Sequence, residues 1–337
     1  MNMKLELSLY FAICAVVVFV LTVIALRILI PILKSIKMGQ KILDIGPRWH
    51  KSKEGTPTMG GLSFIGASLI VGAAVLIYAL LSDAQLEWAK LLICLGFAFL
   101  NGVIGFLDDY TKFFKKQNKG LSAKQKYLLQ LIVAGLFLAG LKMCGALSTE
   151  IVIPFFGWKW DMGWFYYVFM LILITGIVNS VNLTDGIDGL CSSVTFVAAA
   201  FFAVVAFYLS SLSTVIVSAL VIGGTLGFLV YNFHPAKVFM GDTGSLFLGG
   251  MIVALAMLIG HPVLLFLVGI VYICESFSVI LQVGYYKLTH GKRLFKMSPI
   301  HHHFEQCEWT ENQIVFRFSL LTLVFCVIAF VGLMLAI

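Results

Sequence analysis

The chain has 337 residues, of which 61% are hydrophobic and only 12% are charged. About a quarter of the residues in an average soluble domain are charged, so this composition excludes an ordinary soluble protein. Apolar runs of about 18 residues or more recur along the whole chain, and each can cross a bilayer as a helix. The sequence therefore predicts an all-α polytopic membrane protein.

Ten apolar segments are predicted to be the membrane spans of a single integral-membrane domain, residues 1–337. No small-residue cleavage site follows the first apolar run, so we expect a permanent span and not a removable signal peptide. The predicted spans are 9–33, 62–81, 89–107, 127–145, 165–182, 192–210, 214–231, 244–260, 263–286 and 314–336.

Most of the 23 Lys and Arg residues fall in the loops after the first, third, fifth, seventh and ninth predicted spans. Cytoplasmic loops carry an excess of these residues. We therefore expect those five loops to face the cytoplasm and both termini to be extracytoplasmic. The net charge of +7 follows from this asymmetry and gives no indication of nucleic-acid binding.

Two segments depart from the simple pattern of straight spans. The ninth span with its continuation is longer than a bilayer is thick, so we expect a broken or tilted helix, with the break near Gln282. The outer loop near residues 150–160 predicts a short β-hairpin around Phe156–Gly157. Its tryptophans are expected at the membrane interface: Trp158, Trp160 and Trp164.

Five aspartates lie at or near span ends on the predicted cytoplasmic side: Asp108, Asp109, Asp185, Asp188 and Asp242. Each alone could be a helix cap or a solvated loop residue. As a set on one face they favour a shared site at the membrane boundary. Carboxylate oxygens are the ligands that Mg²⁺ prefers, usually together with phosphates.

Glycine-rich turns precede two spans, "EGTPTMGG" at residues 54–61 and "MGDTGS" at residues 240–245. Such turns expose backbone N–H groups at a helix start, where an anion is favoured. Nearby lysines could hold phosphates or could be ordinary topology residues: Lys51, Lys53, Lys112 and Lys124. The P-loop spacing is missing, so ATP is not indicated.

Three consecutive histidines, His301, His302 and His303, occupy the last cytoplasmic loop. A zinc site would combine them with Cys307, but neighbouring residues of an extended segment point in different directions. Contacts to phosphate, sugar or a carboxylate are the favoured interpretation, because imidazole donates hydrogen bonds and titrates near neutrality. A solvated loop patch is the remaining alternative.

Taken together, these motifs resemble one family. "KEGTPTMGG", "GFLDDYTK", "NLTDGIDGL", "FMGDTGSL" and "PIHHHFE" occur in order along nearly the whole chain. The chain resembles the phospho-N-acetylmuramoyl-pentapeptide transferases, within the polyprenyl-phosphate N-acetylhexosamine-1-phosphate transferase superfamily.

The resemblance implies transfer from UDP-N-acetylmuramoyl-pentapeptide to undecaprenyl phosphate, giving lipid I and UMP, with Mg²⁺ as cofactor. This is the first membrane step of peptidoglycan synthesis. It also implies a homodimer in the bacterial cytoplasmic membrane, with a cleft that faces the cytoplasm.

The resemblance also implies roles for individual residues. Asp242 would be the Mg²⁺ ligand, and Asp108, with Asp109 beside it, would deprotonate or orient the lipid phosphate; Asp242 and His301 are also counted as catalytic. The nucleotide and sugar pocket would comprise Asn179, Asn182, Asp185, Asp188 and Phe239, with the Phe239 ring stacked on uracil. Further substrate contacts would be Lys51, Thr56, Lys112, Lys124, Gln282, His302 and His303.

Two other functions stay open at this level. A related transferase would use UDP-GlcNAc in place of the muramoyl donor. An ion-coupled transporter would also place acids in spans, but here the acids gather at one face and no inverted repeat is visible. A one-step displacement and a two-step route through an aspartyl-phosphate both fit the residues.

Overall fold

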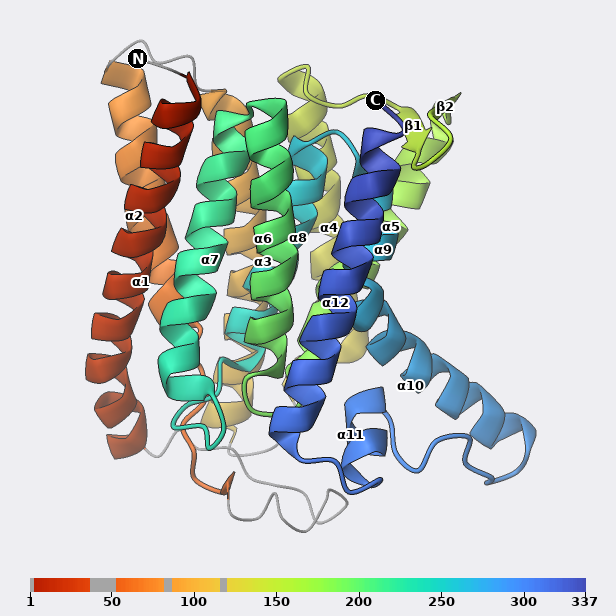
Figure 1. Ribbon diagram of the computed structural model, residues 1–337. Coiled ribbons are helices and arrows are strands. Elements are labelled where there is room, and N and C mark those ends of the chain that lie inside the picture. Colours follow the sequence, from red (N-terminus) through yellow and green to blue (C-terminus); the bar gives the residue numbers. More distant parts are fainter. Residues whose placement is uncertain (1–2, 37–52, 82–86, 116–119) are drawn as a thin grey trace.

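The computed structural model describes residues 3–36, 53–81, 87–115 and 120–337, and nearly all of its regular structure is helical (Figure 1). The elements before the fifth long helix are α1 (Met3–Ser35), α2 (Leu62–Leu81), α3 (Trp88–Phe114), α4 (Ala123–Met143), β1 (Glu150–Ile153) and β2 (Trp158–Asp161). The following elements are α5 (Phe165–Thr184), α6 (Leu190–Leu209), α7 (Leu212–Asn232), α8 (Gly241–Leu258), the 3₁₀ turn η2 (Pro262–Leu264), α9 (Leu265–Val268), α10 (Ile270–Leu288), α11 (Ile300–Glu305) and α12 (Glu311–Met334).

The described residues contain nine helices that are long and apolar enough to span a membrane. A tenth span is formed if the bent pair Pro262–Val268 and Ile270–Leu288 is counted as one crossing. The all-α prediction with about ten spans is therefore confirmed. Helix α3 continues past its predicted end at residue 107, so Asp108, Asp109 and Lys112 lie on the helix.

The ninth span is broken, but the expected position of the break was wrong. Gln282 lies inside α10, and the chain bends by 76° at Gly269. A Cβ atom on residue 269 would lie 2.6 Å from the carbonyl oxygen of Leu265, so only glycine fits at this turn. Beyond the bend, α10 leaves the bundle (Figure 1).

The predicted hairpin is confirmed as the antiparallel pair β1 and β2, with Ile153 opposite Trp158. Its turn contacts the end of α12, because the Phe155 N–H donates to the carbonyl oxygen of Gly332 over 2.8 Å. The three tryptophans of this segment are all exposed: Trp158, Trp160 and Trp164.

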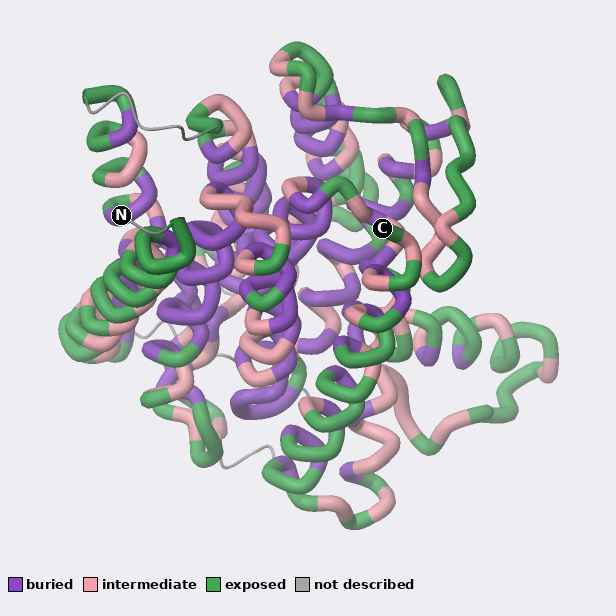
Figure 2. Tube along the Cα trace, turned by 45° about the horizontal axis from the view of Figure 1, so that its top comes forward, coloured by how far each residue is buried: buried purple, intermediate pink, exposed green. Residues whose placement is uncertain are grey.

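Helices α7 and α8 form the interior of the bundle, whereas α1 and α12 keep many apolar side chains exposed (Figure 2). Helix α8 lies close to two neighbours at consecutive glycines. A Cβ on Gly249 would lie 2.8 Å from the Cα of Val178, and a Cβ on Gly250 would lie 2.8 Å from the Cα of Ala98. These two contacts hold the middle of α8 against α3 and α5.

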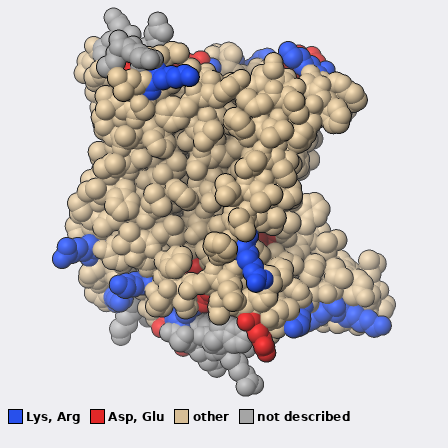
Figure 3. Space-filling view, viewed as in Figure 1, with Lys and Arg blue, Asp and Glu red and all other residues tan. Residues whose placement is uncertain are grey.

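Both ends of the described chain lie at the same end of the bundle, as an even number of crossings requires (Figure 1). Charged side chains lie near the two ends of the molecule, and the band between them is largely uncharged (Figure 3). An outer surface of exposed apolar side chains is stable in lipid and not in water. The fold is therefore that of a multi-pass membrane protein.

Candidate active site

Three carboxylates from two helices meet at one end of the bundle. Asp108 and Asp109 lie near the end of α3, and Asp242 is in the first turn of α8. One oxygen from each lies within 4.8 Å of the others. Asp108 and Asp109 are buried and Asp242 is partly accessible. This acidic triad has the ligand type and spacing that suit a hard divalent cation.

Close helix packing and hydrogen bonds place the triad. A Cβ on Gly105 would lie only 2.1 Å from the carbonyl oxygen of Asp242, so α3 and α8 touch through backbone. One turn later, Asp109 Oδ2 accepts hydrogen bonds from the Thr243 N–H at 2.9 Å and the Thr243 hydroxyl at 2.7 Å. Asp109 therefore satisfies an otherwise open N–H at the start of α8, where a negative charge is also favoured.

The loop before α4 closes over Asp108. The Leu121 N–H donates to Asp108 Oδ1 over 2.8 Å. A Cβ on Gly120 would lie 2.5 Å from the same carboxylate oxygen. The glycine thus lets the backbone approach the acid closely.

Two lysines offset most of the negative charge of the triad. The Lys112 Nζ lies 2.6 Å from Asp108 and 3.0 Å from Asp242. The Lys126 Nζ lies 3.0 Å from Asp242 and 3.1 Å from the side-chain oxygen of Asn182. Three carboxylates facing two ammonium groups leave one net negative charge. A cation at the triad would share these oxygens with the lysines, which could then turn to a phosphate.

The two asparagines of α5 have different partners. Asn182 Nδ2 donates to Asp242 Oδ1 over 2.9 Å and to the Ser245 hydroxyl over 2.8 Å. Asn182 therefore lies directly beside the acidic triad. Asn179, one turn earlier, pairs with the side-chain amide of Gln130 on α4. Asn179 thus ties α5 to α4 next to the site.

Asp185 follows α5 and lies between two groups of acids. Burial raises the pKa of its carboxyl well above the usual range, and the nearby charges of Asp242, Asp109 and Asp188 raise it further. Asp185 therefore interacts electrostatically both with the triad and with Asp188.

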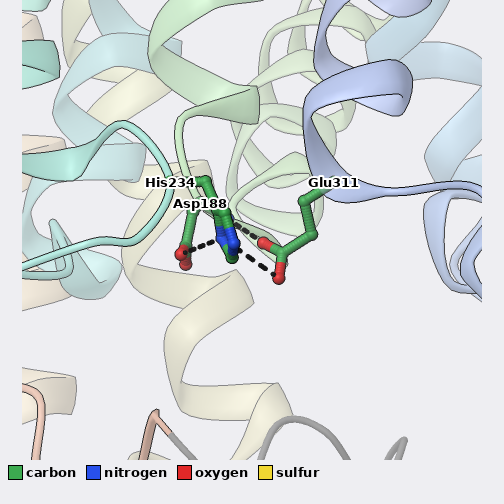
Figure 4. A group of neighbouring side chains, drawn as sticks. All are labelled: Asp188, His234 and Glu311. Carbon is green, nitrogen blue, oxygen red and sulfur yellow. Dashed lines mark hydrogen bonds and ion pairs between the residues drawn. The ribbon is translucent and has the colours of Figure 1, made fainter.

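Asp188 belongs to a second cluster, with His234 and Glu311 (Figure 4). The Lys53 Nζ lies 2.7 Å from Asp188 and 2.6 Å from Glu311. Asp188 Oδ2 lies 2.9 Å from the His234 Nδ1 and accepts the Ala236 N–H over 3.0 Å. The five aspartates are therefore divided between two clusters, with Asp185 between them.

The two glycine-rich segments lie side by side. The Phe239 N–H donates to the carbonyl oxygen of Pro57 over 2.8 Å, and the Gly60 N–H donates back to the carbonyl oxygen of Phe239 over 2.9 Å. Thr56 and Phe239, both half-buried, are thus brought together beside the start of α8. Lys51 lies outside the described residues.

The other expected contacts lie further along the chain. Lys124 is exposed on the first turn of α4. Gln282 is buried, and its Oε1 accepts the N–H groups of Leu294 and Phe295 over 3.1 and 2.8 Å. Gln282 therefore holds the loop between α10 and α11.

The three histidines have three different partners. His301 is buried and its Nδ1 lies 3.0 Å from Glu275, whereas the His302 Nδ1 lies 2.5 Å from Glu305. The His303 Nδ1 accepts the Lys296 N–H over 3.1 Å. The Cys307 Sγ lies 3.9 Å from the His303 Nε2, but within the part of the chain that the structure describes no third potential ligand joins them, so the four converging ligands of a structural zinc site are not formed.

Several residues at the site were not predicted from the sequence: Lys126, Thr243, Ser245, His234, Glu275 and Glu311. Of these, Lys126 could have been found from helical spacing. Glu311 could not, because it belongs to none of the five motifs and reaches Asp188 only in the folded chain.

Comparisons with known proteins agree with this geometry. The family model described as "Glycosyl transferase family 4" matches residues 91–260, which include the triad. The pattern described as "Phospho-N-acetylmuramoyl-pentapeptide-transferase signature 1" matches residues 53–65.

Three similar proteins each carry the name phospho-N-acetylmuramoyl-pentapeptide-transferase. The one from Listeria monocytogenes is 46% identical over 302 residues, covering 90% of this chain and 91% of the relative. The one from Halalkalibacterium halodurans is 46% identical, covering 92% and 94%, and the one from Clostridium novyi is 45% identical, covering 94% and 95%. Identity this high over nine-tenths of both chains shows that the chain belongs to the phospho-N-acetylmuramoyl-pentapeptide transferase family.

Proposed function

We propose that this chain transfers phospho-N-acetylmuramoyl-pentapeptide from its UDP conjugate to undecaprenyl phosphate, giving lipid I and UMP. The observation that carries the proposal is the triad of Asp108, Asp109 and Asp242, flanked by Lys112 and Lys126 at the end of membrane-spanning helices. A charged nucleotide donor and a lipid-borne phosphate can meet only at such a boundary. A site of mixed carboxylates and ammonium groups suits phosphoryl transfer, where positioning and electrostatics contribute most of the rate enhancement.

The triad fits Mg²⁺ by its oxygen ligands and spacing. Held there, Mg²⁺ would supply positive charge against the pyrophosphate and the departing UMP. Asp242 would be the central ligand, because its carboxylate is the most accessible of the three. Asp108 would deprotonate or orient the attacking lipid phosphate, and the lysines would hold phosphate oxygens as point charges.

The site is proposed to face the cytoplasm, because Lys and Arg are in excess in the loops on its side, and the protein is proposed to act as a homodimer, as the family resemblance implies. Cysteine labelling tests the orientation. In a background with the seven native cysteines replaced by serine, a cysteine at exposed Lys124 should react with an impermeant maleimide only in inside-out vesicles, and one at exposed Trp158 only in right-side-out vesicles. The reverse pattern would overturn the orientation. Crosslinking in native membranes tests the dimer.

A transfer assay with labelled donor tests the function directly. Purified protein, polyprenyl phosphate and UDP-muramoyl-pentapeptide should give labelled lipid and UMP, and EDTA should abolish the product. Asp242→Asn should lose turnover and change the Mg²⁺ dependence. Near-normal turnover of this variant at an unchanged metal optimum would show that the metal assignment is wrong.

The same assay separates the alternatives. Labelled lipid from UDP-GlcNAc alone would indicate the related transferase. Release of UMP in detergent, where no ion gradient exists, excludes a pure transporter. Release of about one UMP per enzyme without any lipid acceptor would favour the two-step route, and strict dependence on the acceptor would favour direct displacement.

A further inference from the structure

A buried carboxylate–imidazole pair lies outside the acidic triad, between α10 and α11. Glu275 on α10 and His301 at the start of α11 are both fully buried. Glu275 Oε2 lies 3.0 Å from the His301 Nδ1 and 3.4 Å from the His301 backbone N. Glu275 thus holds both the ring and the backbone of the first histidine in "HHH".

Stability alone does not explain this pair. An acidic side chain within a membrane-spanning helix opposes insertion by about 2.5–3.5 kcal/mol at the helix centre. Even a fully ionised buried pair is often no more stable than apolar residues of the same shape. Moreover, the pair is incompletely satisfied, because Glu275 Oε1 and the His301 Nε2 are buried without a hydrogen-bond partner among the described residues. Such orphaned polar atoms are uncommon in native structures and often mark a functional constraint.

The unpaired side of the imidazole contacts the loop between α5 and α6. A Cβ on Gly186 would lie 2.1 Å from the His301 Nε2, so the ring is packed directly against the Gly186 backbone. Next to Glu275 on α10, the Ser276 hydroxyl lies 2.6 Å from the hydroxyl of Ser180 on α5. His301 of α11 therefore contacts the loop that begins with Asp185, and α5, which leads into this loop, is joined to α10 beside Glu275.

We propose that Glu275 is a positioning residue for the donor end of the site, a role that rests on the proposed transferase function. By accepting the Nδ1–H, the carboxylate fixes the tautomer and the orientation of His301. The oriented ring holds Gly186, and Gly186 sets the place of Asp185. In metal sites, loss of a carboxylate that orients a liganding imidazole commonly lowers affinity or activity about 10- to 100-fold, and we expect an effect of that order for the imidazole that positions this loop.

The test is Glu275→Gln, compared with Ser278→Ala as a matched control. Ser278 is also buried on α10, and its hydroxyl donates only to the backbone carbonyl of Glu275, so the control removes a polar group without altering the pair. Glu275→Gln should raise the KM for the UDP donor about 10-fold and leave the KM for polyprenyl phosphate unchanged. A merely structural defect would lower the amount of active enzyme and the apparent kcat, with both KM values unchanged.

A second variant keeps the proposal testable if Glu275→Gln does not fold. Gly186→Ala perturbs the same contact from the loop side and should raise the donor KM in the same way, whereas Gly176→Ala, with open space around its Cβ, should not. Donor KM values within twofold of wild type in both Glu275→Gln and Gly186→Ala would overturn the inference. A wild-type protein that forms no lipid product would instead overturn the proposed function. Calorimetry of UMP binding to wild type and variants needs no turnover, so it tests the role of Glu275 separately from the transfer reaction.

Discussion

Replacement of Gly105 by alanine should disable the site without removing any functional group. The added Cβ would lie 2.1 Å from the carbonyl oxygen of Asp242 and 2.4 Å from its carbonyl carbon. Ordinary van der Waals contact begins near 3.4 Å, so α3 and α8 must separate by about 1.3 Å at this point. Thr243 would move away from Asp109 by a similar amount, and its hydrogen bonds of 2.9 and 2.7 Å would open to about 4 Å and be lost.

The expected loss of activity is large because Asp242, the proposed metal ligand, and the two acids of α3 lie on opposite sides of this contact. Displacement by about 1 Å can lower turnover about 100-fold, and overpacking lowers stability by about 1–3 kcal/mol. The assay is labelled lipid formation at saturating donor and Mg²⁺, with a melting curve for each variant.

Gly96→Ala is the matched control, because it lies on the same helix with nothing within 4 Å of its Cβ. It should keep normal activity. If Gly105→Ala retained more than half of the wild-type turnover, or if both variants lost activity equally, the close contact of α3 and α8 would not be what positions the triad.

Three further outcomes are expected. Lys126→Gln should lower turnover. It should also lower the half-saturating Mg²⁺ concentration in a metal titration, because the Lys126 ammonium, 3.0 Å from Asp242, competes with the cation. A higher half-saturating Mg²⁺ concentration would contradict this. Because the pKa of Asp185 is raised, its ionisation opposes folding, and stability falls as the pH rises from about 4 toward the raised value. Asp185→Asn should therefore have a higher melting temperature than wild type at about pH 7.5 and the same melting temperature as wild type at about pH 4. Equal melting temperatures of the two proteins at both pH values would contradict the raised pKa of Asp185. Glu311→Gln should lower the melting temperature, because it weakens a buried ion pair, whereas Glu308→Gln, at an exposed position, should not.

The membrane spans could be predicted because each is defined by a long local run of apolar residues. Hydropathy does not report where a polar segment stops being helical, however, and the predicted third span ended before Asp108. The structure continues α3 to Phe114, since the polar residues find partners on α8 and the loop before α4. Their helical spacing then places Lys112 one turn after Asp108.

The break in the ninth span shows a different limit. Length alone indicated that the span could not be straight, and a polar side chain was chosen as the place of the break. Gln282 instead stays helical and uses its side chain to hold the next loop. The bend lies at Gly269, where the requirement is steric: no Cβ fits beside the Leu265 carbonyl oxygen. A glycine within an apolar run gives no such signal, because most glycines in these helices have other roles.

The choice between Lys124 and Lys126 depended on helix geometry that the sequence does contain. Ser122 and Gln125 form a capping box, so the first turn of α4 begins at Ala123. Residues two positions apart in a helix lie on nearly opposite faces, and this applies to Lys124 and Lys126. Lys126 shares its face with Gln130, Val133 and Phe137, all buried against the bundle, and so its ammonium is directed toward Asp242. Lys124 lies on the outer face. The face of the helix on which each lysine lies therefore decides which one contacts the triad. A motif match that ignores the helix start cannot distinguish Lys124 from Lys126.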